Sequence, residues 1–572
     1  MKARKLIRTM AALVCAASVS AAGACSAPLG LPTRGDVTTL APIERQDRRV
    51  YTVPDGPEAD AQPESVVEGF FAAMPAGVQS DGFAVAREFL TDGAAERWNG
   101  DESAIIYSGA PTFVRKPNVD GGSSMDEAGI LIQATLHIIG RIDGQGLYSA
   151  VGDDPWTVTF TLHRQDGQWR IDQLPQGVMV SVASFDQAFR QVSLYRPDVT
   201  GTTMVPDVRW LSWRNWRTRA MEELLGGVPD WLEGAVSDVA DGRVGLQVDA
   251  VPMESDGVAV RLDEGFAALD AASQAMLVRQ IRLTLGDGTD GQEVNVLSGG
   301  ETYSGAEGTV GLDVADHEEA LYALSGGNVV SLESSSPVRV AQNTGIDEAE
   351  ALVFGESGGA VLRADGVAEC LDGEGMPCGV LFDGAPVSTV AEGVEGEVWG
   401  VAPDGRTLVV SRQGRTARIA VPDLGTGSIH AVAVSPEGAR LAMAVGGGPD
   451  EGVLIAGIVR DGTGMAERLC ETWHRVSSRS DVSMLTFYND ITLVYATDGA
   501  SARQQAFRQL TPGPETAQSL PDSTVTSIAT GDVSRYHRLA VFDDLGIVRT
   551  ASGSLEGAWT IVYSQAEAIS AR

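Results

Sequence analysis

Cys25 is the residue whose surroundings point most clearly to a covalent reaction. The small residues Ala22, Gly23 and Ala24 precede it, and they end a 15-residue apolar run that follows a basic N-terminus. Crossing a bilayer takes roughly 20 apolar residues, so this run is typical of a cleaved secretory signal. Small residues let an extended backbone enter a peptidase cleft, and the Cys25 thiol can then take a thioether-linked diacylglycerol.

This arrangement resembles a bacterial lipobox. The resemblance implies that residues 1–24 are a signal peptide and that Cys25 carries an S-diacylglycerol and an N-acyl chain such as palmitate. The lipobox prefers Leu where this sequence has Ala22, and Ala22-Gly23-Ala24 also fits the ordinary A-x-A secretory site, so simple secretion stays open as an alternative. With lipidation, the mature chain would be anchored on the extracytoplasmic face of the cell membrane through Cys25 alone.

The composition indicates that the protein after Cys25 is acidic. The 572 residues allow three or four domains, and 42 Lys and Arg against 77 Asp and Glu give a formal net charge of −35. Such a surface repels phosphate, which excludes a nucleic-acid partner and disfavours direct contact with anionic headgroups. Residues 25–62 contain repeated prolines and no apolar period, and we expect them to form the lipid anchor and a disordered tether.

Two further segments match catalytic motifs but lack their context. Residues 286–291 read G-x-G-x-x-G, yet they follow a predicted helix and precede a predicted strand, the reverse of a dinucleotide loop. Residues 355–359 read G-x-S-x-G, but a strand pattern and not a helix follows Ser357. The chain also lacks H-E-x-x-H, P-loop and C-x-x-C patterns. We therefore predict a helix-ending loop and a hairpin, with no catalytic, cofactor-binding or metal site.

Three cysteines besides Cys25 remain after removal of the signal peptide. Cys370 and Cys378 enclose a turn rich in glycine with one proline, and the exported compartment is oxidising. We predict that these two form a small disulfide. Cys470 is then left over, and we expect it to be a buried, inert thiol.

Residues 63–190 are predicted to form an α+β domain. Apolar residues at helical spacing follow Ser65 and Asp81, which predicts two amphipathic helices. Strand patterns follow at 131–139 and at 156–162, and the turn Asp166-Gly167 then leads into a partner strand.

Helices followed by a curved antiparallel sheet resemble the cone-shaped fold of nuclear-transport-factor-two-like and SnoaL-like domains. That fold often hosts enzymes. His137 and His163 lie in the predicted strands and are the candidates for its pocket. A strand histidine without a carboxylate or cysteine at ligand spacing is more often a hydrogen-bonded structural residue, and we prefer that interpretation.

Residues 191–305 are predicted to form a second, smaller α+β domain. A helix should end at Gly226-Gly227, and a longer one should run from Ser273 to Gly286. Alternating apolar residues predict strands at 244–248 and 258–262, and a further strand at 294–297. The segments 219–232 and 257–262 resemble a GerMN domain, which is known as a wall- or membrane-associated protein-interaction module.

Residues 306–572 are predicted to be all-β. The segment 398–410 recurs 33 residues later as 431–443, each copy with a Pro-acid-Gly turn between two strand patterns. Weaker copies at irregular spacing favour four-stranded blades with variable loops, as in a β-propeller of five to seven blades. A two-sheet sandwich is the alternative.

The lipobox, the segment 63–98, the GerMN-like unit and the propeller-like end together resemble the LpqB lipoproteins of actinobacteria. The resemblance covers essentially the whole mature chain. It implies a cell-envelope partner of the MtrAB two-component system, one that touches the extracytoplasmic domain of the sensor kinase MtrB and modulates signalling, cell division and envelope properties.

Two classes of function follow from the sequence. We prefer a non-catalytic binding protein, since no domain shows a nucleophile, a base and an orienting group together. The alternative is an envelope ligand sensor or hydrolase that uses the cone pocket or the propeller face, because such folds usually bind there.

Overall fold

A computed structural model of the chain describes most of residues 53–570. The gaps in that range are 117–128, 153–154, 256, 287–292, 304–312, 315–319, 334–336, 341–345, 347–348, 500–502, 534–535 and 552–557. Cys25, the predicted signal peptide and most of the predicted tether lie outside the described residues. None of the helices in the described ranges is long and apolar enough to cross a membrane.

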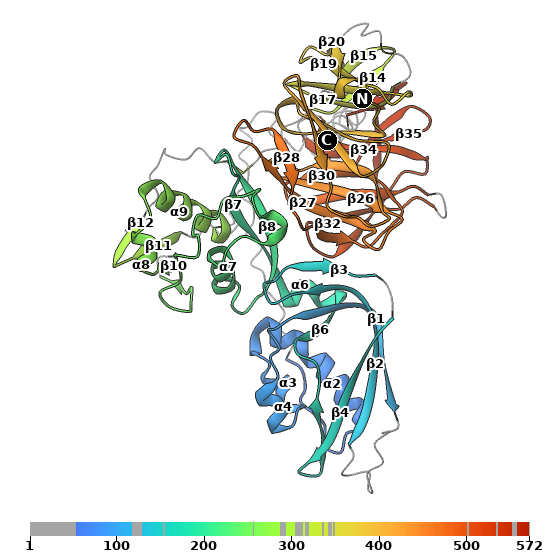
Figure 1. The fold of residues 1–572 in the computed structure, drawn as a ribbon. Helices are drawn as coiled ribbons and strands as arrows, with labels where there is room; N and C mark the ends of the chain where they lie inside the picture. Colours follow the sequence, from blue (N-terminus) through green and yellow to red (C-terminus); the bar gives the residue numbers. More distant parts are fainter. Residues whose placement is uncertain are drawn as a thin grey trace, which may run out of the picture. The chain divides into compact units, whose positions relative to one another are not determined.

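The N-terminal α+β region begins with a group of helices (Figure 1). They are α2 (Pro63–Ala76), the π-helical turn η2 (Gly77–Asp81), α3 (Ala84–Glu88) and α4 (Asp92–Arg97). The Asp81 carboxylate accepts a hydrogen bond of 2.7 Å from the Phe83 amide, and Thr91 Oγ1 accepts one of 3.2 Å from the Ala94 amide. These hydrogen bonds satisfy amides at the starts of the short helices. The helix predicted after Asp81 is α3, and α4 is a further short helix.

The helices pack against a six-stranded sheet of order β5-β4-β2-β1-β6, with β3 paired to β2. Its strands are β1 (Ala104–Lys116), β2 (Ile130–Ile142), β3 (Tyr148–Ala150), β4 (Pro155–Gln165), β5 (Gln168–Gln173) and β6 (Val178–Ser181). The predicted turn at Asp166-Gly167 is confirmed, and both of its residues have positive φ. Aromatic rings fill the space between helices and sheet; for example, the Phe70 and Trp98 centroids lie 5.3 Å apart.

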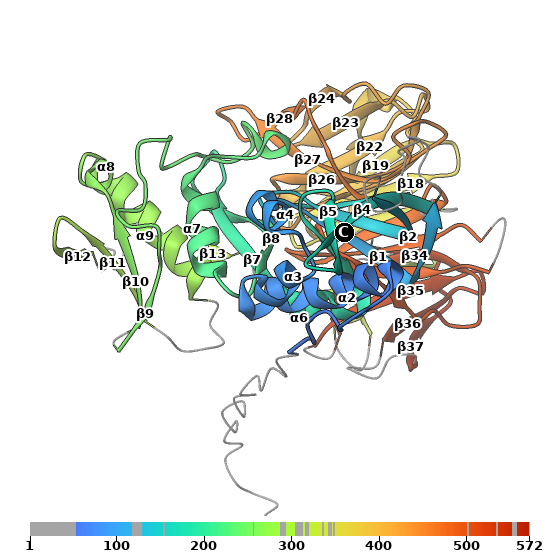
Figure 2. The ribbon, with the colours of Figure 1, turned by 90° about the horizontal axis from the view of Figure 1, so that it is seen from below.

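The middle region is built on the antiparallel hairpin β7 (Phe189–Pro197) and β8 (Thr203–Ser212), which the sequence patterns did not reveal. Figure 2 shows α7 and α9 beside this hairpin. Helix α7 (Trp216–Leu225) ends at Gly226 as predicted. Helix α9 (Ala271–Leu285) starts two residues before the predicted Ser273, because the Asp270 side chain caps it by accepting from the Ala272 and Ser273 amides.

A four-stranded sheet of order β12-β11-β10-β9 completes this region. Its strands are β9 (Met253–Glu254), β10 (Gly257–Leu262), β11 (Val294–Ser298) and β12 (Glu301–Tyr303). The short helix α8 (Glu264–Ala267) and then α9 lie between β10 and β11. The prediction of a strand at 244–248 was wrong. Only Leu246 makes a bridge, to Leu262, and Val248 is 47% exposed, so the segment has too little buried apolar surface to extend its pairing.

The C-terminal region is all-β, and its described residues form six sheets, as expected of a propeller. The first combines β14 (Tyr322–Ser325), β15 (Asn328–Ser331), β16 (Val338–Arg339) and the C-terminal β38 (Ala568–Ile569). The other five sheets are β17–β20, β21–β24, β25–β29, β30–β33 and β34–β37. The innermost strands β38, β17, β21, β25, β30 and β34 contact one another in a closed ring. We number the sheets blade 1 to blade 6 in this order.

The strand bounds of blades 2 to 6 are as follows: β17 (Ala349–Gly355), β18 (Gly358–Arg363), β19 (Ala368–Leu371), β20 (Pro377–Val380), β21 (Thr389–Glu392), β22 (Val398–Val401), β23 (Thr407–Arg412), β24 (Arg415–Ala420), β25 (Ser428–Val434), β26 (Arg440–Gly446), β27 (Gly452–Arg460), β28 (Ala466–Leu469), β29 (His474–Ser477), β30 (Val482–Asn489), β31 (Thr492–Thr497), β32 (Ala506–Leu510), β33 (Glu515–Gln518), β34 (Val525–Val533), β35 (Tyr536–Asp543), β36 (Ile547–Ala551) and β37 (Trp559–Ser564). One further short strand, β13 (Asp313–Val314), pairs in parallel with β8.

The sequence repeat that predicted the propeller does not mark the blade period. The copy at 398–410 joins the second and third strands of blade 3, whereas the copy at 431–443 joins the first and second strands of blade 4. A Pro-acid-Gly turn suits any tight hairpin, so it recurs at different places in the blades. The innermost strands of these two blades begin at Thr389 and Ser428, a spacing typical of the roughly 40 residues in a four-stranded blade.

The two motif matches lie in the contexts that the sequence predicted. The G-x-S-x-G segment forms the turn between the antiparallel strands β17 and β18, so Ser357 has no helix behind it. Gly286 ends helix α9, and the next strand is β11. The rest of the G-x-G-x-x-G segment lies outside the described residues.

Candidate functional site

Strand β8 carries a buried cluster of charges between the three folded regions. The Asp207 carboxylate is fully buried and accepts two hydrogen bonds of 2.8 Å from Arg209, one from Nε and one from Nη2. Arg196 Nε of β7 lies 3.7 Å from Asp207 Oδ2. One carboxylate thus serves two guanidinium groups that are almost completely buried.

The two arginines extend this cluster to other elements. Arg196 donates to the Glu223 carbonyl at 3.0 Å and to the Leu224 carbonyl at 3.4 Å, at the C-terminal end of α7, where a positive charge is favourable. Arg209 Nη1 donates to the Gln145 carbonyl at 3.1 Å, in the loop between β2 and β3. Burial opposes the charge on Arg209, but the Asp207 carboxylate more than offsets it and raises the Arg209 pKa.

A second buried ion pair approaches β8 from the propeller. Arg440 is fully buried, and its Nε and Nη2 donate to Glu437 at 2.6 and 3.0 Å. Its Nη1 donates to the Pro206 carbonyl of β8 at 3.3 Å. Trp210 Nε1, also on β8, donates to the Pro512 carbonyl at 2.8 Å. Strand β8 is therefore held to blades 4 and 5 by hydrogen bonds that water does not reach.

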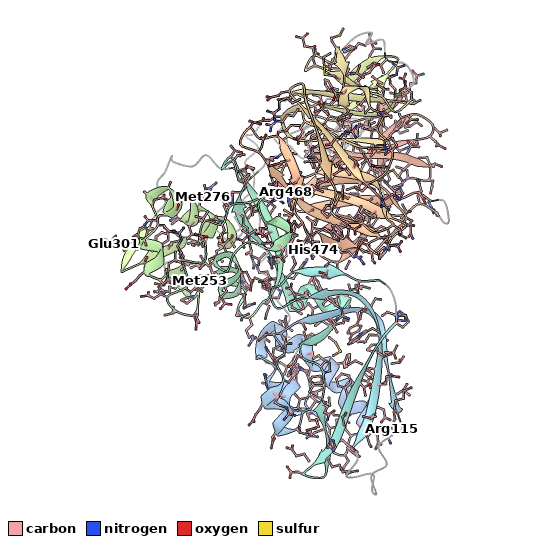
Figure 3. The ribbon with its side chains drawn as sticks, in the orientation of Figure 1. Arg115, Met253, Met276, Glu301, Arg468 and His474 are labelled. Carbon is pink, nitrogen blue, oxygen red and sulfur yellow. A yellow bond between two sulfur atoms is a disulfide. The ribbon has the colours of Figure 1, made fainter. Side chains whose placement is uncertain are left out.

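His474 joins the propeller to the N-terminal sheet; Figure 3 labels it beside β3. Its Nε2 donates to the Tyr148 carbonyl of β3, and its ring lies 6.0 Å from that of Trp231. Burial lowers the pKa of His474 to about 4, although the Tyr148 carbonyl works in the opposite direction. The folded protein thus holds this imidazole neutral.

We expect acid to weaken the junction through His474. The unfolded chain takes up this proton near pH 6.5 and the folded protein only near pH 4, so the stabilisation is complete above pH 6.5 and is lost as the pH falls toward 4. Between pH 7 and pH 5 the wild type should lose about 2 kcal/mol more than a His474→Gln variant, which keeps a donor for Tyr148.

The measurement is urea unfolding of both proteins at the two pH values. Burial also raises the pKa of the Glu392 carboxyl to about 8, so lowering the pH changes the stability through Glu392 in the direction opposite to His474. Both proteins contain Glu392, so the comparison with the variant cancels its contribution. Equal losses in wild type and variant would contradict this role for His474.

Two polar cavities lie on either side of the loop that begins at Asp143. One of about 490 Å³ is lined by Asn99, Asp101, Asn215 and Glu222 among others. The other, of about 360 Å³, lies between Arg209, Glu223, Trp231 and His474. Glu223 ion-pairs with Arg219, and His474 Nε2 donates to the Tyr148 carbonyl. No nucleophile, base and orienting group meet in the described parts of these cavities.

The histidines considered for a cone pocket do not line its interior. His137 is exposed and His163 is half-buried, while the inward-facing Leu136 and Leu162 beside them are buried. Alternation along β2 and β4 places both histidines on the outer face of the sheet. Across the residues with described side chains, no group of three or more His, Cys, Asp and Glu is arranged to hold a metal ion.

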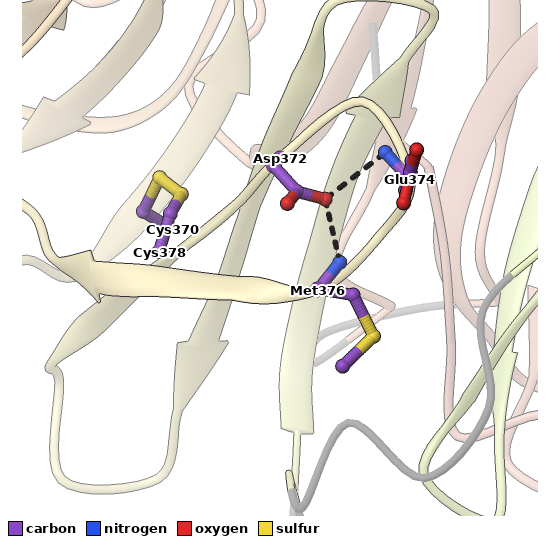
Figure 4. The surroundings of a disulfide bond; sticks show 5 residues. All are labelled: Cys370, Asp372, Glu374, Met376 and Cys378. Atoms are coloured by element: carbon purple, nitrogen blue, oxygen red, sulfur yellow. Dashed lines mark hydrogen bonds between the residues drawn. A yellow bond between two sulfur atoms is a disulfide. The ribbon is translucent and has the colours of Figure 1, made fainter.

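The cysteines occupy two different settings. Cys370 and Cys378 are joined by a disulfide at the outer edge of blade 2, with their Cα atoms 5.1 Å apart (Figure 4). Cys470 is buried, its Sγ donates to the Glu233 carbonyl at 3.1 Å, and burial raises its pKa to about 11. Its thiolate is disfavoured, which makes it an inert link between the middle region and the propeller.

Comparison with known proteins gives consistent matches. The family model for the N-terminal domain of lipoprotein LpqB matches residues 56–186, and the one for the LpqB beta-propeller domain matches residues 370–567. A lipoprotein LpqB from Bifidobacterium longum is 46% identical over 100% of both chains. One from Streptomyces avermitilis is 26% identical over 92% of both.

These matches confirm the resemblance drawn from the sequence. The relatives come from actinobacteria, and their shared name is that of a lipoprotein and not of an enzyme. The order of an α+β N-terminal region and a C-terminal propeller is also as predicted. The chain therefore belongs to the LpqB family of envelope-associated lipoproteins.

Proposed function

We propose that the mature chain is anchored to the cell membrane by lipid on Cys25 and binds the extracytoplasmic domain of an MtrB-like sensor kinase. Through that contact it biases the kinase output without catalysing a reaction, and so modulates signalling, cell division and envelope properties.

The observation that carries this proposal is the buried junction around β8. Asp207, Arg209 and Arg440 tie the middle region to the N-terminal sheet and to the propeller, so the regions can present one preorganised surface. A rigid surface loses little entropy on binding, so it can bind a protein partner without first being ordered. The charged groups at the junction are used in holding the regions together, which supports a binding role over catalysis.

Two physical properties suit a membrane-embedded partner. An anchored chain on a tether searches a small volume near the membrane, and this raises its effective concentration toward a neighbouring ectodomain. The formal net charge of −35 favours a partner with a basic surface. Electrostatic attraction of this kind speeds encounter and weakens as salt is added.

Calorimetric titration of the mature chain with the purified kinase ectodomain tests the proposal. We expect saturable binding at low salt and a dissociation constant that rises with ionic strength. The ectodomain of an unrelated sensor kinase serves as the control and should give no saturable heat. No binding to the cognate ectodomain at low salt would overturn the proposal and favour the ligand-sensor alternative.

A further inference from the structure

The sequence Asp-Gly-x-Gly-Met occurs at 372–376 and at 461–465. The two copies are equivalent in the propeller, since each connects the third and fourth strands of its blade. We name them the blade 2 turn and the blade 4 turn. In each, the aspartate Oδ1 accepts from the backbone amides two and four residues later, at 3.0 and 2.9 Å in blade 2 and at 2.8 and 3.0 Å in blade 4.

Arginines cover the blade 4 turn. Arg460 Nη1 donates to the Gly464 carbonyl at 2.9 Å, and Arg412 of the neighbouring blade donates to the same carbonyl. Arg415, also from that blade, donates to Thr463 Oγ1 at 3.0 Å. Met465 is only 5% exposed because it packs in the hydrophobic core of blades 3 and 4. In this copy, guanidinium groups bind the carbonyl and the polar side chain of the turn.

The blade 2 turn has the same backbone hydrogen bonds, but no arginine among the described residues donates to it. Its methionine, Met376, is 41% exposed, and the hydrogen bonds that the described residues make with the turn stay inside the hairpin (Figure 4). The inner side of the turn is occupied, because a Cβ on Gly373 would lie 2.9 Å from the Glu356 carbonyl of the same blade. On the outer side Glu374 and Met376 are exposed, whereas Gly375 between them is buried.

The exposed residue of the blade 2 turn favours a basic partner more strongly than its counterpart in the blade 4 turn. Glu374 stands where blade 4 has Thr463, and a carboxylate binds guanidinium more strongly than a hydroxyl does. Residues 349–388, which form blade 2, contain seven Asp and Glu and one basic residue, Arg363. That arginine donates to Glu369 at 2.7 Å, so it does not neutralise Glu374.

Apolar surface and rigidity complete the site. All four residues of the edge strand β20 are exposed, and Val380, at the end of this strand away from the turn, is 58% exposed. The Cys370–Cys378 disulfide closes the base of the hairpin. A hairpin held in one conformation loses less entropy when it is bound. Apolar anchors with a carboxylate at the rim are typical of a protein contact.

We propose that the blade 2 turn is a docking site for an arginine-bearing segment of the kinase ectodomain, a proposal that rests on the function proposed above. A guanidinium group of the partner takes the position that Arg415 occupies on the blade 4 turn, and there it binds the exposed Glu374 carboxylate. Apolar side chains of the partner pack on Met376 and Val380.

The test is titration of the kinase ectodomain with a Glu374→Gln/Met376→Ser variant of the mature chain. Loss of a charged hydrogen bond and of an apolar anchor should raise the dissociation constant about tenfold or more.

The matched control is Asp544→Asn/Leu545→Ser, which removes one charge and one apolar side chain from the turn after Asp543. There Asp543 Oδ1 accepts from two amides in the same way, and Leu545 is 70% exposed. The control should bind like the wild type.

Each outcome separates this inference from the broader function. If the wild type binds and the Glu374 variant binds equally well with an unchanged melting temperature, the docking site is wrong and the proposed function stands. If both variants weaken binding equally, the effect is general charge and not this site. If the wild type does not bind at all, the proposed function fails first. Size-exclusion chromatography completes the test, because a wild-type dimer that only this variant breaks would assign the turn to self-association and overturn the proposal.

Discussion

Replacing Asp207 with alanine is expected to lower the free energy of unfolding by about 3–5 kcal/mol, because the change leaves buried charge without its partner. Asp207 is fully buried, and both of its neighbours, Arg196 and Arg209, stay at most 2% exposed. Both guanidinium groups would then be buried without a carboxylate. Since β8 contacts all three regions, we also expect the connections between them to become sensitive to protease.

Urea unfolding followed by tryptophan fluorescence measures the first effect, and limited proteolysis measures the second. The control is Asp101→Ala, which removes an ion pair with Arg214 in which the two side chains are 48% and 31% exposed. Such a pair contributes at most about 1 kcal/mol. An Asp207 variant that unfolded and resisted protease like the Asp101 variant would show that the buried charges do not hold the regions together.

The sequence predicted the elements whose buried side chains repeat with a clear period. Strand β4 alternates around the buried Phe160 and Leu162, and helix α7 ends at a glycine, so both were found. Strand β8 was missed because its burial does not alternate: eight consecutive residues from Met204 to Leu211 are buried, and charged residues are among them. A strand covered on both faces loses the period-2 signal.

The junction could not be predicted because its partners are far apart in the chain. Arg440 and Pro206 are separated by 234 positions, and His474 and Tyr148 by 326. No local pattern records such pairs. The docking turn is different, since the repeated Asp-Gly-x-Gly-Met was visible in the sequence. What the sequence could not show is that arginines cover one copy while Met376 in the other is exposed.

The second large effect is expected at Cys25. Replacing Cys25 with alanine removes the thiol that lipidation requires, so the protein should leave the membrane fraction or stall in processing. Several acyl chains strengthen anchoring by about 0.8 kcal/mol per buried CH₂, and their loss should be close to all-or-none. Cell fractionation with immunoblotting measures the distribution, and a Cys470→Ser variant, which changes a buried thiol, serves as the control. Unchanged membrane retention with normal processing would favour simple secretion and a different means of attachment.

The central claim is that the protein acts on the kinase by occupancy and not by turnover. Autophosphorylation of the full-length kinase, reconstituted in vesicles with increasing amounts of the lipidated protein, tests it most directly. We predict that the rate changes in proportion to the fraction of kinase bound, reaches a plateau when binding saturates, and returns to its basal value when the lipoprotein is removed. A full change produced by a small substoichiometric amount, or one that persisted after removal, would indicate a catalysed reaction and contradict the account.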